Sequence, residues 1–450
     1  MEKSILSIIV ATVLLGLTAC DGSGESNKQA LDQGSGTKEQ QQVQSKPKEP
    51  ITLYIQNIYS GSPTPEDFMA TYGKLIQQKF PHIQKVEYFT NTSRPLTQAI
   101  ISNDPMDIII TSQATFHSGL LANKLQTDIS DLISQKKYDL NKLDPSSIEL
   151  IKTLGGGKIY GLPVDAGGTY LVYNKDIFDK FGLPYPPDHM TWEQFMDLSK
   201  KLSRTEGGVQ YHGSAFAPVN FMIRNPYALE HTVQGTDKAD FSNPNWSGFL
   251  TQIVDVFKIP GNEKTVAQLG TSGALDLFRK EKVAAMYSPI VANDLSLTFG
   301  FEGMNFDYTQ FPTMPGAPGN VQTYPNIYAV SSTSQHKEDA FDVIAFMTSE
   351  EIQLTKSKQG SFTPLNNAAM LKAFGEQVPD GIKGKNLKIF MEPNKYKTPT
   401  HISEYLTTAN NELNTVLNEV ITGTKDINTA LREATDKANQ KIEQAKNAKK

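Results

Sequence analysis

The chain has 450 residues, of which 38% are hydrophobic and 20% charged, which is enough material for two or three domain cores. Its net charge is -5 and it has five arginines, so it lacks the basic field and the forked guanidinium groups that nucleic-acid binding uses. Its single cysteine excludes a disulfide framework, a cysteine-rich zinc site and a CxxC redox pair.

The first twenty residues predict export and lipid attachment. Lys3 precedes an apolar run from Ile5 to Leu17, which has signal-peptide length and is too short to span a membrane. Small residues then lead to Cys20, a pattern that resembles a bacterial lipoprotein signal. We expect removal of residues 1–19, acylation of Cys20 and a lipid-anchored location on the extracellular face of the cytoplasmic membrane. The alternative is a buried free cysteine behind an uncleaved anchor.

Residues 20–49 are rich in Gly, Ser, Gln and Lys and carry almost no large apolar side chains. Such a segment has no apolar burial to offset the entropy cost of ordering it. We therefore predict a flexible tether here, with the folded body beginning near Pro50.

The body begins with alternating strand and helix patterns. Strand-like alternation over Ile51–Ile55 is followed by a helix that Thr64 caps and Pro81 ends. A second strand at Val86–Phe89, a short helix from Leu96 and an apolar strand at Asp107–Thr111 follow. This β-α-β order predicts a doubly wound α/β lobe.

Polar residues follow the first and third of these strands. Ligands of such sheets bind beyond the carboxyl ends of the strands, so Asn57, Tyr59, Ser112 and Gln113 are candidate binding residues. Ordinary loop polarity is the alternative for each. Near the C-terminus, a stripe from Ile427 to Ile442 has helical spacing and predicts a docked helix rather than a partner-binding one.

Several later segments, taken in order, resemble a known family. They are Gly157–Asp165, Leu171–Phe178, Phe278–Met286, Phe311–Gly316 and Phe346–Glu350. Together they are similar to the family 1 extracellular solute-binding proteins of ABC importers, the maltose-binding-protein-like group. The resemblance implies a two-lobed α/β fold of the periplasmic-binding-protein type (type II), with hinge-linked lobes and a ligand cleft between them. It implies lobe 1 at 50–164 plus 309–354, and lobe 2 at 165–308 plus 355–450.

The resemblance also places chain crossings near Val164–Asp165, Tyr308–Phe311 and Thr355. Asp165 follows the first crossing, where a carboxylate suits sugar hydroxyls; a hinge-orienting or capping role is the alternative. Tyr287 is a further candidate because it follows the apolar strand Val283–Met286, and Phe362 and Tyr405 are candidates by position matched to the family, with core packing as the alternative for each aromatic residue. Asn326 is a candidate from the segment that would return to the first lobe. Where the family often has a glycine-rich run, this chain has Tyr324–Ile327, whose bulk predicts a reshaped cleft.

Two tryptophans have different contexts. Thr191 and Gln194 form a capping box, and Trp192 at that helix start is expected to pack in the core rather than stack on a sugar. Trp246 has no helical or strand pattern around it, and both interpretations stay open.

Motifs for nucleotide binding, a serine nucleophile and metal ligation are missing from the sequence. We therefore expect no cofactor, no metal and no enzyme activity. The expected function is capture of a mono- or oligosaccharide and its delivery to an ABC permease by a monomeric receptor. Two alternatives stay open: a surface glycan-degrading enzyme, since a carboxylate pair has no fixed sequence spacing, and a sensory ligand-binding adaptor.

Overall fold

The computed structural model describes residues 48–59, 63–289, 292–317, 319–365, 367–392 and 397–448. The predicted signal peptide, Cys20 and nearly all of the predicted tether lie outside the described residues. None of the described helices combines the length and apolarity that crossing a membrane requires. No group of His, Cys, Asp or Glu suited to a metal ion occurs within these described ranges.

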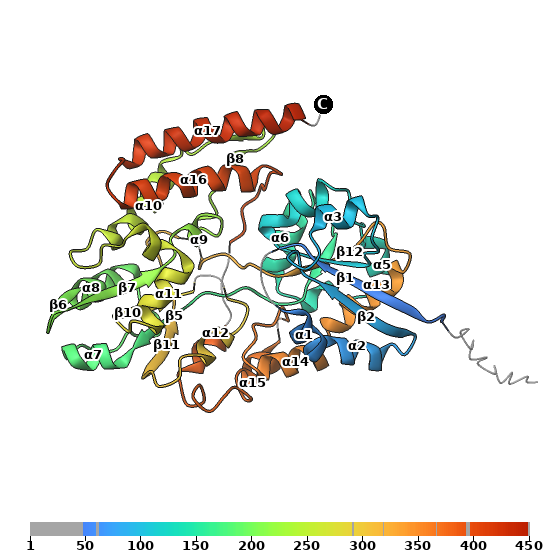
Figure 1. Ribbon diagram of the computed structural model, residues 1–450, viewed down its shortest axis with the longest axis horizontal. Helices are drawn as coiled ribbons and strands as arrows, with labels where there is room; N and C mark the ends of the chain where they lie inside the picture. The colour runs from blue at the N-terminus through green and yellow to red at the C-terminus, as the bar shows by residue number, and fades with distance from the viewer. Residues whose placement is uncertain are drawn as a thin grey trace, which may run out of the picture. The chain divides into compact units, whose positions relative to one another are not determined.

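Two sheets organise the unit Glu49–Lys450 (Figure 1). The first has the order β2-β1-β3-β12-β4, in which β2 and β3 run parallel to β1 while β12 runs antiparallel to β3 and β4. Its strands are β1 (Ile51–Asn57), β2 (Ile83–Phe89), β3 (Ile108–Thr111), β4 (Gly161–Pro163) and β12 (Ile327–Val330).

The second sheet has the order β11-β5-β10-β7-β6 and mixes parallel and antiparallel pairs. Its strands are β5 (Tyr170–Asn174), β6 (Arg204–Glu206), β7 (Val209–Phe216), β10 (Ala284–Ser288) and β11 (Phe306–Gln310). A separate hairpin pairs β8 (Thr232–Val233) with β9 (Lys238–Ala239). The fold has two lobes, and each sheet carries its own hydrophobic core.

Helices cover both sheets (Figure 1). Those of the first half are α1 (Pro65–Phe68), α2 (Lys74–Lys79), α3 (Leu96–Ile101), α4 (Gln113–Thr115), α5 (Ser130–Gln135), α6 (Pro145–Leu154), α7 (Lys175–Phe181), α8 (Trp192–Leu202) and α9 (Val219–Met222). Those that follow are α10 (Pro244–Phe257), α11 (Thr271–Arg279), α12 (Ser296–Phe299), α13 (Lys337–Met347), α14 (Glu350–Lys358), α15 (Ala368–Ala373), α16 (Leu406–Ile421) and α17 (Ile427–Ala448). Short π and 3-10 turns are η1 (Met69–Gly73), η2 (Phe116–Leu121), η3 (Leu140–Lys142), η4 (Val266–Leu269) and η5 (Leu387–Phe390).

The helix caps predicted from the sequence are present in the structure. The Thr64 hydroxyl accepts the N–H of Asp67 at 3.1 Å and starts α1, while η1 separates α1 from α2 within the predicted helix. The capping box of Thr191 and Gln194 starts α8, and Trp192 is buried against Phe195. The prediction that Trp192 packs in the core is confirmed.

Trp246 lies in a helix that the sequence analysis did not find. Asn243 caps α10 and Pro244 occupies its first position, both ordinary start signals. The indole is 1% exposed, with its ring 5.0 Å from that of His231 and 5.4 Å from that of Phe241. Trp246 is therefore a core residue, and a sugar-stacking role is wrong for it.

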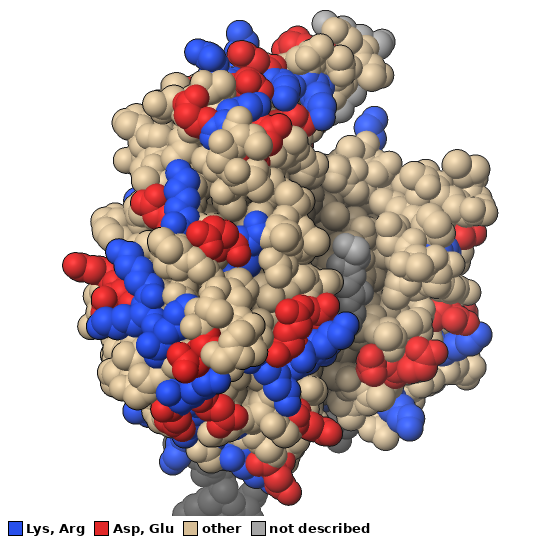
Figure 2. Space-filling view, turned by 60° about the vertical axis from the view of Figure 1, so that its left-hand side comes forward, with Lys and Arg blue, Asp and Glu red and all other residues tan. Residues whose placement is uncertain are grey.

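The predicted C-terminal stripe is buried. Its members Leu431, Ala434, Ala438 and Ile442 lie in the core of the second sheet, and α17 packs along α16 (Figure 1). The expectation of a docked helix is confirmed. On the face drawn in Figure 2, basic and acidic side chains are interspersed and form no patch of one sign.

His231 provides a test of this core by pH. Burial lowers the pKa of His231 from 6.5 to about 4, so folding opposes its protonation. Since the unfolded chain binds this proton more readily, the histidine costs stability as the pH falls through 6.5 toward 4. When the pH is lowered from 7 to 4.5, the free energy of unfolding falls in both proteins. The fall is expected to be about 2 kcal/mol smaller in His231→Gln than in the wild type. Urea titrations at both pH values measure this; equal losses would contradict it.

Candidate functional site

Three segments that connect the two sheets lie side by side. The N–H of Val164 donates to the carbonyl of Asn326 (3.1 Å), and the N–H of Ala166 donates to the carbonyl of Phe362 (2.9 Å). At Gly167 an added Cβ would lie 2.6 Å from backbone atoms of Tyr324, so glycine alone permits this approach. The crossing segments thus form a packed bundle rather than separate loose linkers.

Asp165 is the hydrogen-bonding centre of this bundle. Its Oδ1 accepts the backbone N–H of Asn326 at 2.8 Å and the side-chain Nδ2 of Asn293 at 2.9 Å. Its Oδ2 accepts Nδ2 of Asn326 at 2.6 Å. The carboxylate is 6% exposed, so these protein donors occupy most of its accepting capacity. Asp165 therefore holds the first and second crossings and the loop after β10 in fixed relation.

A cavity of about 880 Å³ opens beside this bundle. Its walls come from the three crossings, from the ends of strands in the first sheet, and from the loop after β10 with α12, and they combine aromatic rings with hydroxyl, amide and carboxylate groups. The aromatic members are Tyr59, Tyr72, Phe299, Tyr324 and Tyr328. The charged members among the described lining residues are Asp67, Asp165, Asp294 and Lys356. The volume and this mixture suit a small organic ligand.

Lys356 brings a positive charge into the cavity. It lies on α14 next to the third crossing, and its ammonium group donates to the hydroxyl of Tyr72 from η1. Burial lowers the pKa of Lys356, but Tyr72, Asp165 and Asp294 outweigh burial and raise it. The lysine is therefore charged at neutral pH.

The carboxylate opposite this lysine is shifted as well. Burial raises the pKa of Asp165, while Lys356 and the N–H donors of Asn326 and Asn293 oppose the rise. Burial also raises the pKa of the Tyr59 and Tyr72 hydroxyls. Both tyrosines consequently stay neutral and can donate or accept hydrogen bonds.

Four of the residues proposed from the sequence lie on the cavity wall: Tyr59, Ser112, Asp165 and Asn326. They come from the ends of β1 and β3 and from two crossings, which are far apart in the sequence. Their ligand-binding role stays a proposal.

The other proposed residues do not line this cavity. Asn57 is fully buried and donates to the Tyr88 hydroxyl at 3.1 Å, and Gln113 is buried at the wall of a separate small pocket. Tyr287, Phe362 and Tyr405 pack among other side chains. The first contacts Phe278, the second stacks on Phe374, and the third is buried in the core of the second sheet. Tyr287 and Tyr405 are thus core residues here, and Phe362 is partly buried against the core cluster that contains Tyr287.

Sequence reasoning missed Tyr72, Asn293, Asp294, Phe299 and Lys356. Local sequence patterns contain no signal for the Lys356–Tyr72 contact, because 284 positions separate the two residues. The third crossing expected near Thr355 did point to the neighbourhood of Lys356.

The limits proposed for the two lobes remain a prediction, with two changes. Leu365 and Met370 pack in the core of the first sheet, so not all of the segment after residue 355 belongs to the second lobe. β11 ends at Gln310 in the second sheet, and Phe311, Met314 and Val321 pack in that sheet's core. We therefore propose that the chain returns to the first lobe between Val321 and Ile327, rather than near Tyr308–Phe311.

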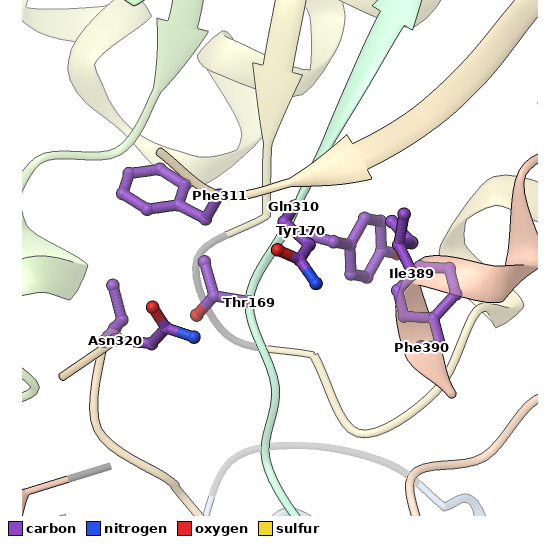
Figure 3. A pocket seen from close by; sticks show the side chains of 8 residues that line it. Thr169, Tyr170, Gln310, Phe311, Asn320, Ile389 and Phe390 are labelled. Carbon is purple, nitrogen blue, oxygen red and sulfur yellow. The ribbon is translucent and has the colours of Figure 1, made fainter. Parts of the chain in front are cut away.

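A second pocket lies near the end of β11 (Figure 3). The side chains of Thr169, Gln310 and Asn320 point toward a common space, with Phe311 on one side. Its volume is about 20 Å³, enough for a water molecule and too small for an organic ligand. The cavity of about 880 Å³ among the crossing segments is the larger of these two and is the candidate ligand site.

Comparison with known proteins places the chain in a family. Residues 62–354 match the bacterial extracellular solute-binding proteins. The chain belongs to this family. Among solved structures of similar fold is the ABC substrate-binding protein of Listeria monocytogenes in complex with cycloalternan. It is 20% identical with a TM-score of 0.69, over 88% of this chain and 99% of that one. At this identity the likeness shows the two-lobed solute-binding-protein fold.

Curated relatives of this solute-binding protein match it over only part of their length. A putative binding protein of Brucella abortus is 26% identical over 244 residues, 50% of this chain and 57% of the relative. The chain thus spans little more than half the length of that relative. The sn-glycerol-3-phosphate-binding periplasmic protein of Rhizobium meliloti is 24% identical over 64% of this chain and 68% of its own.

Proposed function

We propose that this protein is the lipid-anchored receptor of an ABC importer, and that it captures a neutral sugar or polyol in the cavity beside Asp165. The observation that carries the proposal is the wall itself, where tyrosine rings lie among hydroxyl, amide and carboxylate groups. A pyranose has an apolar C–H face for such rings and hydroxyl groups that pair with amides and carboxylates. Ligand contacts with both lobes favour the closed form for delivery to a permease.

The charges on the wall argue against a phosphate ester. Three carboxylates face one ammonium group among the described lining residues, and none of those residues is an arginine. The ammonium of Lys356 already donates to Tyr72 and interacts with Asp165 and Asp294. A phosphate dianion would meet a net negative wall without the forked donors that suit it. The cavity therefore favours a neutral ligand over sn-glycerol 3-phosphate.

Titration calorimetry with D-glucose, D-mannose, maltose, mannotriose, D-mannitol and sn-glycerol 3-phosphate tests this proposal. We expect saturable binding of at least one neutral compound and no binding of the phosphate ester. Thr71→Trp should abolish that binding, because Thr71 is exposed on the cavity wall. Gln78→Trp is the matched control, since Gln78 is exposed on α2 away from the cavity.

Two results would contradict the proposal. Tighter binding of sn-glycerol 3-phosphate than of every neutral compound would reverse the charge argument. Release of reducing sugar from maltose or mannotriose by the purified protein would favour the glycan-degrading alternative. A sensory adaptor would differ from an importer in the cell: deletion would abolish signalling and leave uptake of the ligand intact.

The anchor is tested at Cys20. Cys20→Ala removes the thiol that acylation requires, so metabolic labelling with a fatty acid should disappear. The variant should be found as uncleaved precursor or in the medium, while Cys20→Ala protein purified from either source keeps the wild-type ligand affinity. Unchanged labelling and unchanged membrane retention would contradict the predicted lipoprotein signal.

A further inference from the structure

Tyr324 separates the cavity from a buried arginine. Its ring is half-buried on the cavity wall, in the second crossing segment. Arg224, from the end of α9, is fully buried, and its guanidinium carbon lies 5.5 Å from the centre of the Tyr324 ring. Arg224 itself does not line the cavity. The ring is thus the boundary between the ligand space and the interior behind it.

Contacts on both sides keep this ring in place. Its hydroxyl lies 3.3 Å from the Ser112 hydroxyl and accepts the backbone N–H of Ala114, also at 3.3 Å, in the first lobe. Gln322, two residues before Tyr324, is fixed to the second lobe. Nε of Arg224 donates to the carbonyl of Gln322 at 2.9 Å, and the N–H of Gln322 donates back to the carbonyl of Arg224 at 3.1 Å.

The backbone at Tyr324 is equally confined. It packs against Gly167, where an added Cβ would come within 2.6 Å of it. A side chain held at its hydroxyl, its ring and its backbone resists displacement by a ligand, because moving it breaks all of these contacts.

We propose that Tyr324 ends the ligand site on the side of Arg224 and thereby restricts the receptor to short saccharides. This inference rests on the proposed sugar-binding function and names its substrate class. A ligand that abuts the ring has no further space in this direction, and a longer chain must displace packed side chains. Pockets discriminate size in this way through the cost of overpacking.

Calorimetry on length series tests the substrate class. Glucose, maltose, maltotriose and maltotetraose form one series; mannose, mannobiose and mannotriose form the other. In the wild type we expect affinity to fall beyond the disaccharide. Tyr324→Ala should raise the affinity for the longest member relative to the disaccharide by about tenfold or more. Tyr324→Phe keeps the ring and should keep the wild-type ratio. An unchanged ratio in Tyr324→Ala would overturn the proposal.

Arginine modification tests the boundary without any sugar. Phenylglyoxal should leave Arg224 unmodified in the wild type and in Tyr324→Phe, and should modify it in Tyr324→Ala, as read by peptide mass spectrometry. Arg432 is exposed on α17 and serves as an internal control that reacts in all three proteins. Circular dichroism checks that each variant is folded.

The two measurements separate the two ideas. If the wild type binds no saccharide of either series, the proposed function fails for these sugars, and the length selectivity fails with it. Arg224 labelling still decides whether Tyr324 forms the wall. If Arg224 stays protected in a folded Tyr324→Ala protein, the wall is elsewhere, and the inference is overturned even where sugars bind.

Discussion

Replacing Asp165 with alanine is expected to lower the free energy of unfolding by about 3 kcal/mol and to weaken ligand binding as well. Three N–H donors, two from Asn326 and one from Asn293, lose their acceptor. Each unsatisfied buried donor costs about 1–3 kcal/mol, and water from the cavity relieves part of this. Affinity falls because the donors hold cavity-wall residues of both lobes in position. Urea titration and calorimetry on the same variant measure the two effects.

Asp294→Ala is the matched control. Asp294 also lies on the cavity wall, but the hydrogen bonds described for it are local, from the N–H (2.8 Å) and the hydroxyl (2.5 Å) of Ser296. Its loss should cost about 1 kcal/mol, as for a helix cap. If Asp165→Ala retains wild-type stability and loses affinity alone, Asp165 is a direct ligand contact, and the positioning role is wrong.

The features that the sequence predicted well depend on neighbours along the chain. β3 reads as an apolar run because both faces of the sheet are covered. The caps at Thr64 and Thr191 need only the following turn of helix. The stripe of α17 needs only helical periodicity. For such elements, local spacing carries nearly all of the information.

The candidate site depends on contacts that local spacing does not contain. Tyr287 follows an apolar strand pattern and looked like a strand-end residue, but β10 continues to Ser288 and turns its ring into the core. Asp165 was expected to offer its carboxylate to a ligand or to orient the hinge. Its partners Asn293 and Asn326 are more than a hundred residues away, and only the fold shows that their N–H groups occupy the carboxylate oxygens. The bulk of Tyr324 was visible in the sequence, whereas the buried Arg224 behind it was not.

Lys356→Met is expected to reduce ligand affinity by about tenfold to 150-fold. The ammonium group has three N–H donors, and the hydrogen bond described for it, to the Tyr72 hydroxyl, uses one of them on the cavity wall. A hydrogen bond from a charged group to a ligand contributes about 1.5–3 kcal/mol, which corresponds to this loss. Methionine keeps the length and the apolar stem, so the change isolates the charge. Calorimetry with the panel compound that binds the wild type most tightly measures it.

The same substitution distinguishes a charge inside the cavity from an ordinary surface lysine. Lys358, on the same helix, forms an ion pair with Glu376 at 3.3 Å and does not line the cavity. The control variant Lys358→Met should therefore cost less than about 1 kcal/mol of stability and leave the ligand affinity unchanged. Burial lowers the pKa of Lys356, but Tyr72, Asp165 and Asp294 outweigh burial and raise it, so the contribution of the charge is complete below the ordinary pKa and is lost only as the pH rises through the folded value. The affinity difference between the wild type and Lys356→Met should therefore persist unchanged from about pH 6 to pH 9. Equal affinities of Lys356→Met and the wild type would remove Lys356 from the ligand site, and a difference that disappears by pH 8 would show that burial, rather than its carboxylate neighbours, sets its protonation.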